Sequence, residues 1–296
     1  MQTIQTNKRI LVSNVLFATD FAKSSKAALP YAIALARQYG AKVFIAHAIA
    51  LEPNLSVPLD PPPANADPSR LDAERHLADL ARAASVGNVA HEELLARGDV
   101  SNVLLDIAQK ENVDLIVTAT RAKHGLTKLV LGSNAEKIYR QAKCPVLTIG
   151  PHVPPLETTD WRIKHILFPT DGSEASRAAL PYALSLAEEN QATLILLQLM
   201  PLIPPALLEG YETSIRESLR ALVPAEANCW CSPEFVVRFE FPAEGILRLA
   251  AERGVDLIVM GVKKSSSGSA ISTHLPWAIA SQVVAEAECP VLTVRG

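Results

Sequence analysis

The chain has 296 residues and a formal net charge of −3, and 49% of its residues are hydrophobic. This composition excludes a disordered chain, and the balanced charge excludes a global field that would attract nucleic acid or an anionic membrane. The first apolar run, residues 10–17, is too short to span a membrane and has no signal-peptide cleavage site after it. We therefore expect a cytoplasmic protein of two domains that binds neither nucleic acid nor membrane.

Short apolar runs alternate with helix-like stretches along the first half of the chain. The runs predict strands over residues 14–18, 42–48, 114–118 and 145–149, and the stretches between them predict helices over residues 24–39, 67–85, 101–111 and 134–141. Continuous apolar strands are typical of a sheet that helices cover on both faces. The alternation therefore predicts an α/β fold in which right-handed βαβ units build a doubly wound parallel sheet.

The second half of the chain repeats the first. The segment V-L-F-A-T-D at 15–20 matches I-L-F-P-T-D at 166–171, an offset of 151 residues (171 minus 20), and A-A-L-P-Y-A recurs at the same offset. The runs D-L-I-V and C-P-V-L-T also occur twice. Because the period is domain-sized, we expect two tandem domains over residues 9–152 and 160–296, with a proline-rich linker between them.

The four cysteines do not indicate a disulfide framework in a chain of this length. Cys144 and Cys289 each precede a proline and an apolar run, which favours small buried side chains. Cys229 and Cys231 form a C-x-C pair without a second pair nearby, and this is fewer ligands than a metal ion needs. We expect no metal site.

Polar and small residues follow the predicted strands of the first domain. Ligands of doubly wound sheets bind beyond the carboxyl ends of the strands, and the free amides at a helix start suit a phosphate. A carboxylate, a loop and a helix start together indicate a nucleotide pocket, although an aspartate here is equally a turn or N-cap residue and the helix start equally an ordinary one. The candidate residues are Ala18, Thr19, Asp20, Thr118, Ala119, Gly132, Ser133 and Asn134.

The combination of these segments resembles the universal stress protein family, and the resemblance covers nearly the whole chain. It is carried by V-L-F-A-T-D-F at 15–21, I-L-F-P-T-D-G-S at 166–173, L-G-S-N-A-E-K-I at 131–138, and the D-L-I-V and C-P-V-L-T runs. The resemblance implies a five-stranded parallel sheet in each Rossmann-like domain, and two domains that pair through their last strands. It also implies a role in survival of stress, without a defined catalytic reaction.

One branch of this family binds ATP through the pattern G-x2-G-x9-G-(S/T), and another branch does not bind it. The first domain keeps the spacing, but Ala119 and Ala122 stand at the first two glycines, followed by Gly132 and Ser133. An alanine methyl group intrudes where the backbone approaches a phosphate. We therefore expect a degenerate ATP pocket in this domain, with Mg²⁺ only as the companion of ATP.

The resemblance also implies roles for single residues of the first domain. Asp20 contacts the adenosine, Ala48 lines the adenine pocket, and Ser133 and Asn134 hold phosphates. The second domain departs further from the pattern, because Lys264 stands at the second glycine and Trp277 replaces the last one. We expect the second pocket to be empty or altered.

Three functions are compatible with these residues. The first is a stress-response regulator or sensor that binds ATP, and the second is a nucleotide-free scaffold for protein interactions. The third, a nucleotide or phosphoester hydrolase, ranks last because no nucleophile and base can be paired from the spacing. We therefore do not expect an enzyme. The two domains are expected to form an intramolecular pseudo-dimer, and both a homodimer and further protein partners remain open.

Overall fold

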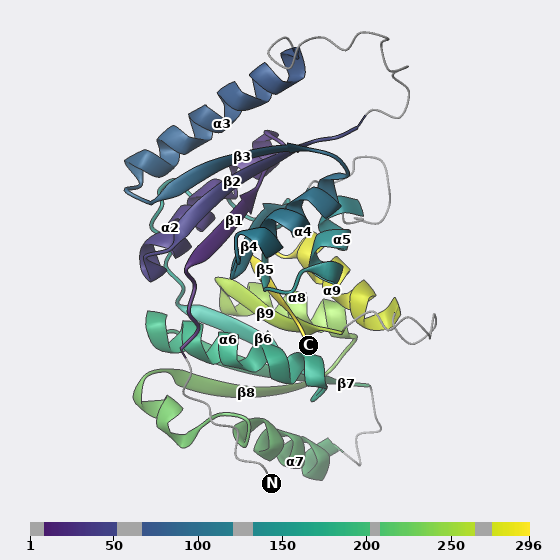
Figure 1. Cartoon of the computed structure of the whole chain (residues 1–296). Coiled ribbons are helices and arrows are strands. Elements are labelled where there is room, and N and C mark those ends of the chain that lie inside the picture. Colours follow the sequence, from purple (N-terminus) through teal and green to yellow (C-terminus); the bar gives the residue numbers. More distant parts are fainter. Residues whose placement is uncertain (1–8, 52–66, 121–132, 202–207, 264–273) are drawn as a thin grey trace.

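Strands and helices alternate in each half of the chain, and the strands of both halves join in one sheet (Figure 1). The computed structural model describes residues 9–51, 67–120, 133–201, 208–263 and 274–296. The first half contains β1 (Asn14–Ala18), α1 (Lys23–Lys26), α2 (Leu29–Tyr39), β2 (Lys42–Ile49), α3 (Pro68–Val86), β3 (His91–Arg97), α4 (Val100–Lys110), β4 (Leu115–Ala119), α5 (Ser133–Gln141) and β5 (Val146–Ile149). The second half contains β6 (His165–Pro169), α6 (Glu174–Asn190), β7 (Thr193–Met200), α7 (Leu208–Arg220), a 3₁₀ helix (Ala225–Cys229), β8 (Ser232–Phe239), α8 (Pro242–Arg253), β9 (Leu257–Val262), α9 (His274–Glu286) and β10 (Val291–Arg295).

The sheet has ten strands in the order β3-β2-β1-β4-β5-β10-β9-β6-β7-β8. Within each half the neighbouring strands are parallel, and both halves have the same doubly wound order. The junction between β5 and β10 is antiparallel, with Leu147 opposite Leu292. The predicted fold of two five-stranded parallel domains is therefore confirmed, and so is their pairing through the last strands.

Two layers of helices sandwich the sheet. Apolar side chains of α2, α3, α6 and α7 pack with one face of the strands, and those of α4, α5, α8 and α9 pack with the other. The strands between the two edge strands β3 and β8 are buried on both faces, which accounts for their unbroken apolar sequences. Among the described residues, no helix is both long enough and apolar enough to cross a membrane.

One predicted element is wrong and one was missed. Residues 24–39 form two helices, α1 and α2, whereas the matching stretch of the second domain forms the single helix α6. Helix α6 begins with Ser173, whose hydroxyl accepts from an amide of the first turn, and with Glu174, whose charge suits a helix N-terminus; α1 has neither an acid nor a side-chain cap. Strand β3 was missed because its edge position leaves H-E-E-L-L-A-R only partly buried.

The aspartate of each D-L-I-V run holds the start of the neighbouring strand. Asp114 Oδ2 accepts from the amides of Ser13 and Asn14 at 2.8 and 3.0 Å. Asp256 Oδ2 accepts from the amides of Lys164 and His165 at 2.7 and 2.9 Å. These four amides precede or begin β1 and β6, so the repeated aspartate satisfies donors that the ladder leaves unpaired.

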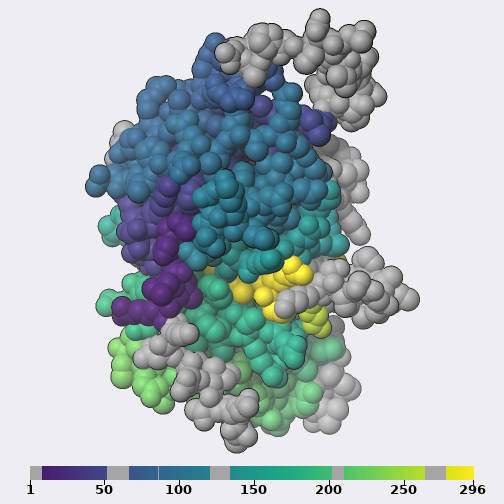
Figure 2. Space-filling model, in the orientation of Figure 1, coloured from purple at the N-terminus to yellow at the C-terminus, as the bar shows by residue number. Residues whose placement is uncertain are grey.

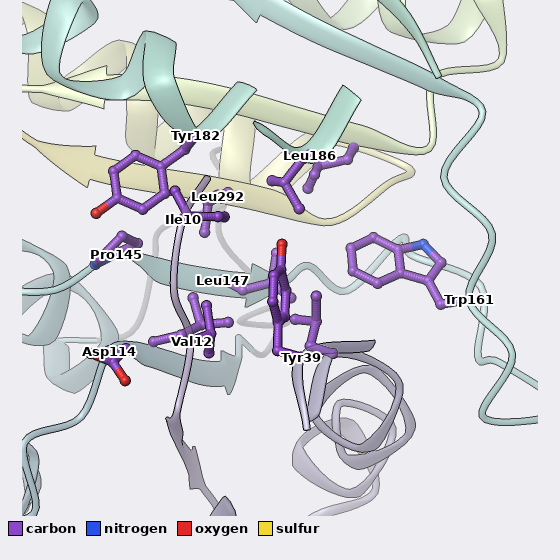
Figure 3. A pocket seen from close by; sticks show the side chains of 13 residues that line it. Ile10, Val12, Tyr39, Asp114, Pro145, Leu147, Trp161, Tyr182, Leu186 and Leu292 are labelled. Carbon is purple, nitrogen blue, oxygen red and sulfur yellow. The ribbon is translucent and has the colours of Figure 1, made fainter. Parts of the chain in front are cut away.

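The two domains meet around an axis on which equivalent leucines face each other. Leu35, Leu115 and Leu147 of the first domain line the same small apolar pocket as their counterparts in the second domain (Figure 3). Polar contacts cross the junction on both faces of the sheet, since the Tyr39 hydroxyl donates to Glu189 between α2 and α6, and the Tyr139 hydroxyl lies 3.0 Å from that of Ser281 between α5 and α9. The counterparts of the three leucines are Leu186, Leu257 and Leu292.

We expect Asp114→Ala to lower the free energy of unfolding by about 1–3 kcal/mol, because it removes two hydrogen bonds to a charged group, one from the exposed Ser13 amide and one from the partly buried Asn14 amide. Asp256→Ala should have a similar effect, and Asp106→Ala, on the surface of α4, should change stability by less than about 0.5 kcal/mol. Urea unfolding followed by circular dichroism measures all three. Equal stability of the Asp114 and Asp106 variants would contradict this role.

We expect stability to fall above pH 10 in part through Tyr39. Burial raises the pKa of the Tyr39 hydroxyl, and the hydrogen bond to Glu189 raises it further. The unfolded chain releases this proton near pH 10 while the folded chain retains it, so the contribution is complete below pH 10 and is lost as the pH rises.

Tyr39→Phe should therefore cost about 1–2 kcal/mol at pH 7, and the difference from wild type should shrink above pH 10. Denaturant unfolding at several pH values tests this. Tyr211→Phe removes a hydroxyl from an exposed ring and is the matched control. A difference that stays constant between pH 7 and pH 11 would contradict the linkage.

Candidate functional site

The end of β1 turns sharply through Thr19. Its amide donates to Ala46 O at 3.0 Å, and its hydroxyl lies 3.1 Å from that of Ser25 and accepts from the Phe21 amide at 3.0 Å. Asp20 is exposed, and its Oδ1 accepts from the Ala22 amide at 3.0 Å. The turn therefore presents Asp20 at the carboxyl edge of the sheet, and the turn role that the sequence left open for Asp20 is present.

A stack of three rings stands beside this turn. Phe21 adopts a positive φ of 62° and places its ring 4.2 Å from the ring of His47 and 5.0 Å from that of His76. His47 Nδ1 lies 2.8 Å from Thr19 O, so the histidine is fixed between β2 and the turn. His47 therefore acts here by packing against Phe21 and by hydrogen bonding to the turn.

Phe21 was not predicted as a site residue, although the repeat carries a signal for it. The residue that matches Phe21 in the second domain is Gly172, which has a φ of 72°. A glycine adopts this conformation freely, whereas a bulky residue is strained there by about 1 kcal/mol or more. The contacts with the two histidines offset this strain in the first domain.

The remaining candidates converge on the same edge as far as the structure describes them. Ala18, Ala48 and Thr118 are buried near the carboxyl ends of β1, β2 and β4, and Ala119 is the last residue of β4. Because these strands are parallel neighbours, their ends lie together. Ala122 and Gly132 lie outside the described residues.

The start of α5 is held by the neighbouring helix. Ser133 is the first residue of α5, and its side chain is outside the described part of the structure. The exposed Asn134 accepts through Oδ1 from the Ser101 hydroxyl at 3.1 Å, and Ser101 is fully buried. This bond fixes the first turn of α5 against α4, and with it the backbone amides that a phosphate would use.

Charged side chains at the ends of β3 and α3 are paired among themselves. Asp67 accepts from the Ser69 hydroxyl and amide and pairs with Arg97, and the hydrogen bond from Ser69 is the main cause that holds its pKa below the usual value. Asp99 pairs with Lys137 across 3.6 Å. Within the described residues, no three potential metal-binding side chains gather together.

The second domain repeats the turn. The Thr170 hydroxyl donates to Ser176 Oγ at 3.0 Å, and the Ser173 amide donates to Asp171 Oδ1 at 3.0 Å. Desolvation raises the pKa of Asp171, but hydrogen bonds from Ser173 and Ser176 outweigh it and leave the pKa below its usual value. The turn is thus a property of the duplicated fold and does not by itself mark a ligand site.

The two domains differ in how closely a helix packs against the end of their fourth strand, which is β4 in the first domain and β9 in the second. Gly261 of β9 lies so close to α6 that a Cβ atom there would come within 2.1 Å of Ala175 O. The matching residue in the first domain is Ala119, whose methyl group is accommodated on β4. The glycine at 261 is therefore explained by helix packing, and the backbone of α6 lies against the strand end where the ATP-binding pattern has its first glycine.

Comparison with known proteins agrees with this architecture. The sequence profile of the universal stress protein family matches residues 12–150 and 162–295. The chain belongs to the universal stress protein family. A universal stress protein of Methanocaldococcus jannaschii is 28% identical over 151 residues, which cover 50% of this chain and 88% of that protein. One from Thermus aquaticus is 31% identical over 140 residues, covering 47% of this chain and 99% of that protein.

Solved structures show the same tandem arrangement. A universal stress protein from Archaeoglobus fulgidus superposes with a TM-score of 0.71 at 18% identity, covering 95% of this chain and 98% of that one. A protein of unknown function from Pseudomonas aeruginosa has a TM-score of 0.67 at 19% identity, covering 96% of this chain and 92% of that one. At these identities the similarity establishes the fold alone.

We expect Gly261→Ala to destabilise the chain by about 2 kcal/mol or more, because the new methyl group overlaps backbone that cannot move aside cheaply. Ala119→Gly, the reciprocal change in the first domain, should cost about 1 kcal/mol or less. Thermal unfolding of both variants measures the difference. Equal melting temperatures would show that α6 does not depend on a glycine at 261.

Proposed function

We propose that this universal stress protein is a stress-response regulator that binds ATP in its first domain. The observation that carries the proposal is the convergence of the Asp20 turn, the buried Ala48 and the Asn134 helix start on one edge of the first-domain sheet. A carboxylate suits the hydroxyls of a ribose, a buried alanine leaves room for a flat base, and a helix start suits a phosphate.

The second domain is proposed not to bind nucleotide. Helix α6 packs against Gly261 and also against Gly296, where a Cβ atom would come within 2.3 Å of the Ala175 backbone. This packing places the backbone of α6 directly against the ends of β9 and β10. Helix α6 begins against the strand ends of the second domain, whereas the matching stretch of the first domain begins with the short helix α1. We therefore expect one nucleotide per chain.

The proposed activity is regulatory and not catalytic. Asp20 is held by the Ala22 amide and Asn134 by the Ser101 hydroxyl, and these contacts suit residues that position a ligand. Bound ATP would act by favouring one conformation or one partner over another. Mg²⁺ would accompany the phosphates, because the described residues offer no cluster that binds a metal ion without them.

Calorimetric titration with MgATP tests the proposal, and we expect about one ATP per chain. Asp20→Ala should weaken binding by about tenfold or more, since a hydrogen bond to a charged group contributes about 1.5–3 kcal/mol. Asp171→Ala, the equivalent change in the second domain, is the matched control and should leave the affinity unchanged.

Absence of binding at millimolar ATP would refute the proposal and favour the nucleotide-free scaffold, which the alanine at position 119 also favours. Phosphate release with saturation kinetics would contradict the regulatory assignment and point to a hydrolase. Loss of binding in both aspartate variants would place the site elsewhere.

A further inference from the structure

Within the described residues, the junction between the domains is covered by the linker on one side and is open on the other. The pseudo-symmetry of the pair makes Tyr31 and Tyr182 equivalent, and likewise Cys289 and Cys144. We call the surroundings of Tyr31 and Cys289 the covered half, and those of Tyr182 and Cys144 the open half. The chain has one linker between the domains, and this linker lies over only one of the two halves.

The covered half shows how a peptide segment fits this junction. The Tyr31 hydroxyl donates to Pro154 O in the linker at 3.2 Å, and the Tyr31 ring packs edge-on against Trp161 with centroids 5.1 Å apart. Gly150 runs so close to α9 that a Cβ atom would come within 2.6 Å of Val284 O. As a result only 3% of Tyr31 and 7% of Cys289 are exposed.

The open half contains a groove instead. Tyr182 and Cys144 are only half-buried, and the Tyr182 hydroxyl makes no hydrogen bond with any residue that the structure describes. The N-terminal segment forms one wall and runs along the surface at the domain boundary (purple in Figure 2), where 84% of Leu11 is exposed. The cavity has a volume of about 400 Å³, and its lining includes Leu11, Leu105, Gln141, Lys143, Cys144 and Tyr182.

The groove continues into the apolar pocket on the axis between the domains. Ile10, Val12, Pro145 and Tyr182 line both spaces, and Figure 3 shows Tyr182 directed toward Pro145 from α6. The volume of the groove, about 400 Å³, is within the range of about 300–1,000 Å³ found for ligand pockets. A ligand in the groove would therefore extend the apolar interface between the two domains. It would contact the Tyr182 ring and the apolar wall of the groove, and polar side chains would surround it at the rim.

We propose that this groove binds an extended, proline-containing peptide segment of a partner protein. The covered half is the template, because there the segment from Gly150 to Pro154 presents a carbonyl to the equivalent tyrosine hydroxyl. Proline-containing segments are extended, expose carbonyl acceptors and lack some of the amides that would otherwise need partners. Grooves lined by aromatic rings bind such segments in many proteins.

A fluorescent synthetic peptide with the linker sequence of residues 150–157, Gly-Pro-His-Val-Pro-Pro-Leu-Glu, tests the proposal against the full chain. Fluorescence anisotropy should show saturable binding. Tyr182→Phe should weaken it about two- to tenfold, the effect of one hydrogen bond, and Leu11→Asp should weaken it about tenfold by placing a charge in the apolar wall. Tyr211→Phe, an exposed tyrosine on α7, should not change it.

Circular dichroism melts establish that each variant folds, and Leu11→Asp is safe in this respect because the side chain is already exposed. No saturable binding of the peptide would overturn the proposal. Equal affinity for wild type, Tyr182→Phe and Leu11→Asp would place any binding outside the groove and would also overturn it. A peptide with its three prolines replaced by alanine should bind more weakly, and equal binding would remove the proline requirement.

Discussion

The antiparallel pairing of β5 with β10 is the constraint on which the rest of the molecule depends. Each five-stranded parallel sheet ends in a strand whose outer edge has unpaired amides and carbonyls, and such an edge is a site of aggregation unless it is covered. Here the two edges satisfy each other, with Leu147 opposite Leu292 and Thr293 donating through its hydroxyl to Val146 O at 3.2 Å. The duplicated chain carries both edges, so this pairing forms within one molecule and does not depend on protein concentration.

The antiparallel junction also decides where ligands can bind. It places the carboxyl ends of the first-domain strands on the same side as the amino ends of the second-domain strands, so the two candidate pockets face opposite sides of the molecule. The linker from β5 to β6 runs along only one of these sides, near Tyr31, so it does not cover the other. The asymmetry of the groove therefore results from joining two equivalent domains with one connection.

Much of this architecture could be predicted because its signals are local and repeated. The apolar strand runs and the repeat predicted a duplicated parallel sheet, and the family resemblance implied that the domains pair through their last strands. The order of the strands was not predicted and comes from the structure. The split between α1 and α2 was not predicted, because it depends on a cap at Ser173 that its counterpart Ala22 lacks, while both copies contain the same proline. The strand β3 was missed because an edge strand of partly exposed residues lacks the apolar run by which the others were found.

The candidate site was less predictable than the fold, because its parts come together only in three dimensions. Gly261 matches Ala119 and so occupies the first position of the ATP-binding pattern, yet its surroundings show that the packing of α6 requires a glycine there. Conversely, Phe21 drew no attention in the sequence, although its positive φ and its stacking on His47 shape the turn that carries Asp20. A motif residue can thus be retained for packing after the site has changed, and a residue outside the motif can hold the site in place. The two copies of this domain show the difference in one chain. The same turn holds Asp20 in the first domain and Asp171 in the second. The strand end beside it has room for the methyl group of Ala119 in the first domain, whereas α6 packs against Gly261 in the second.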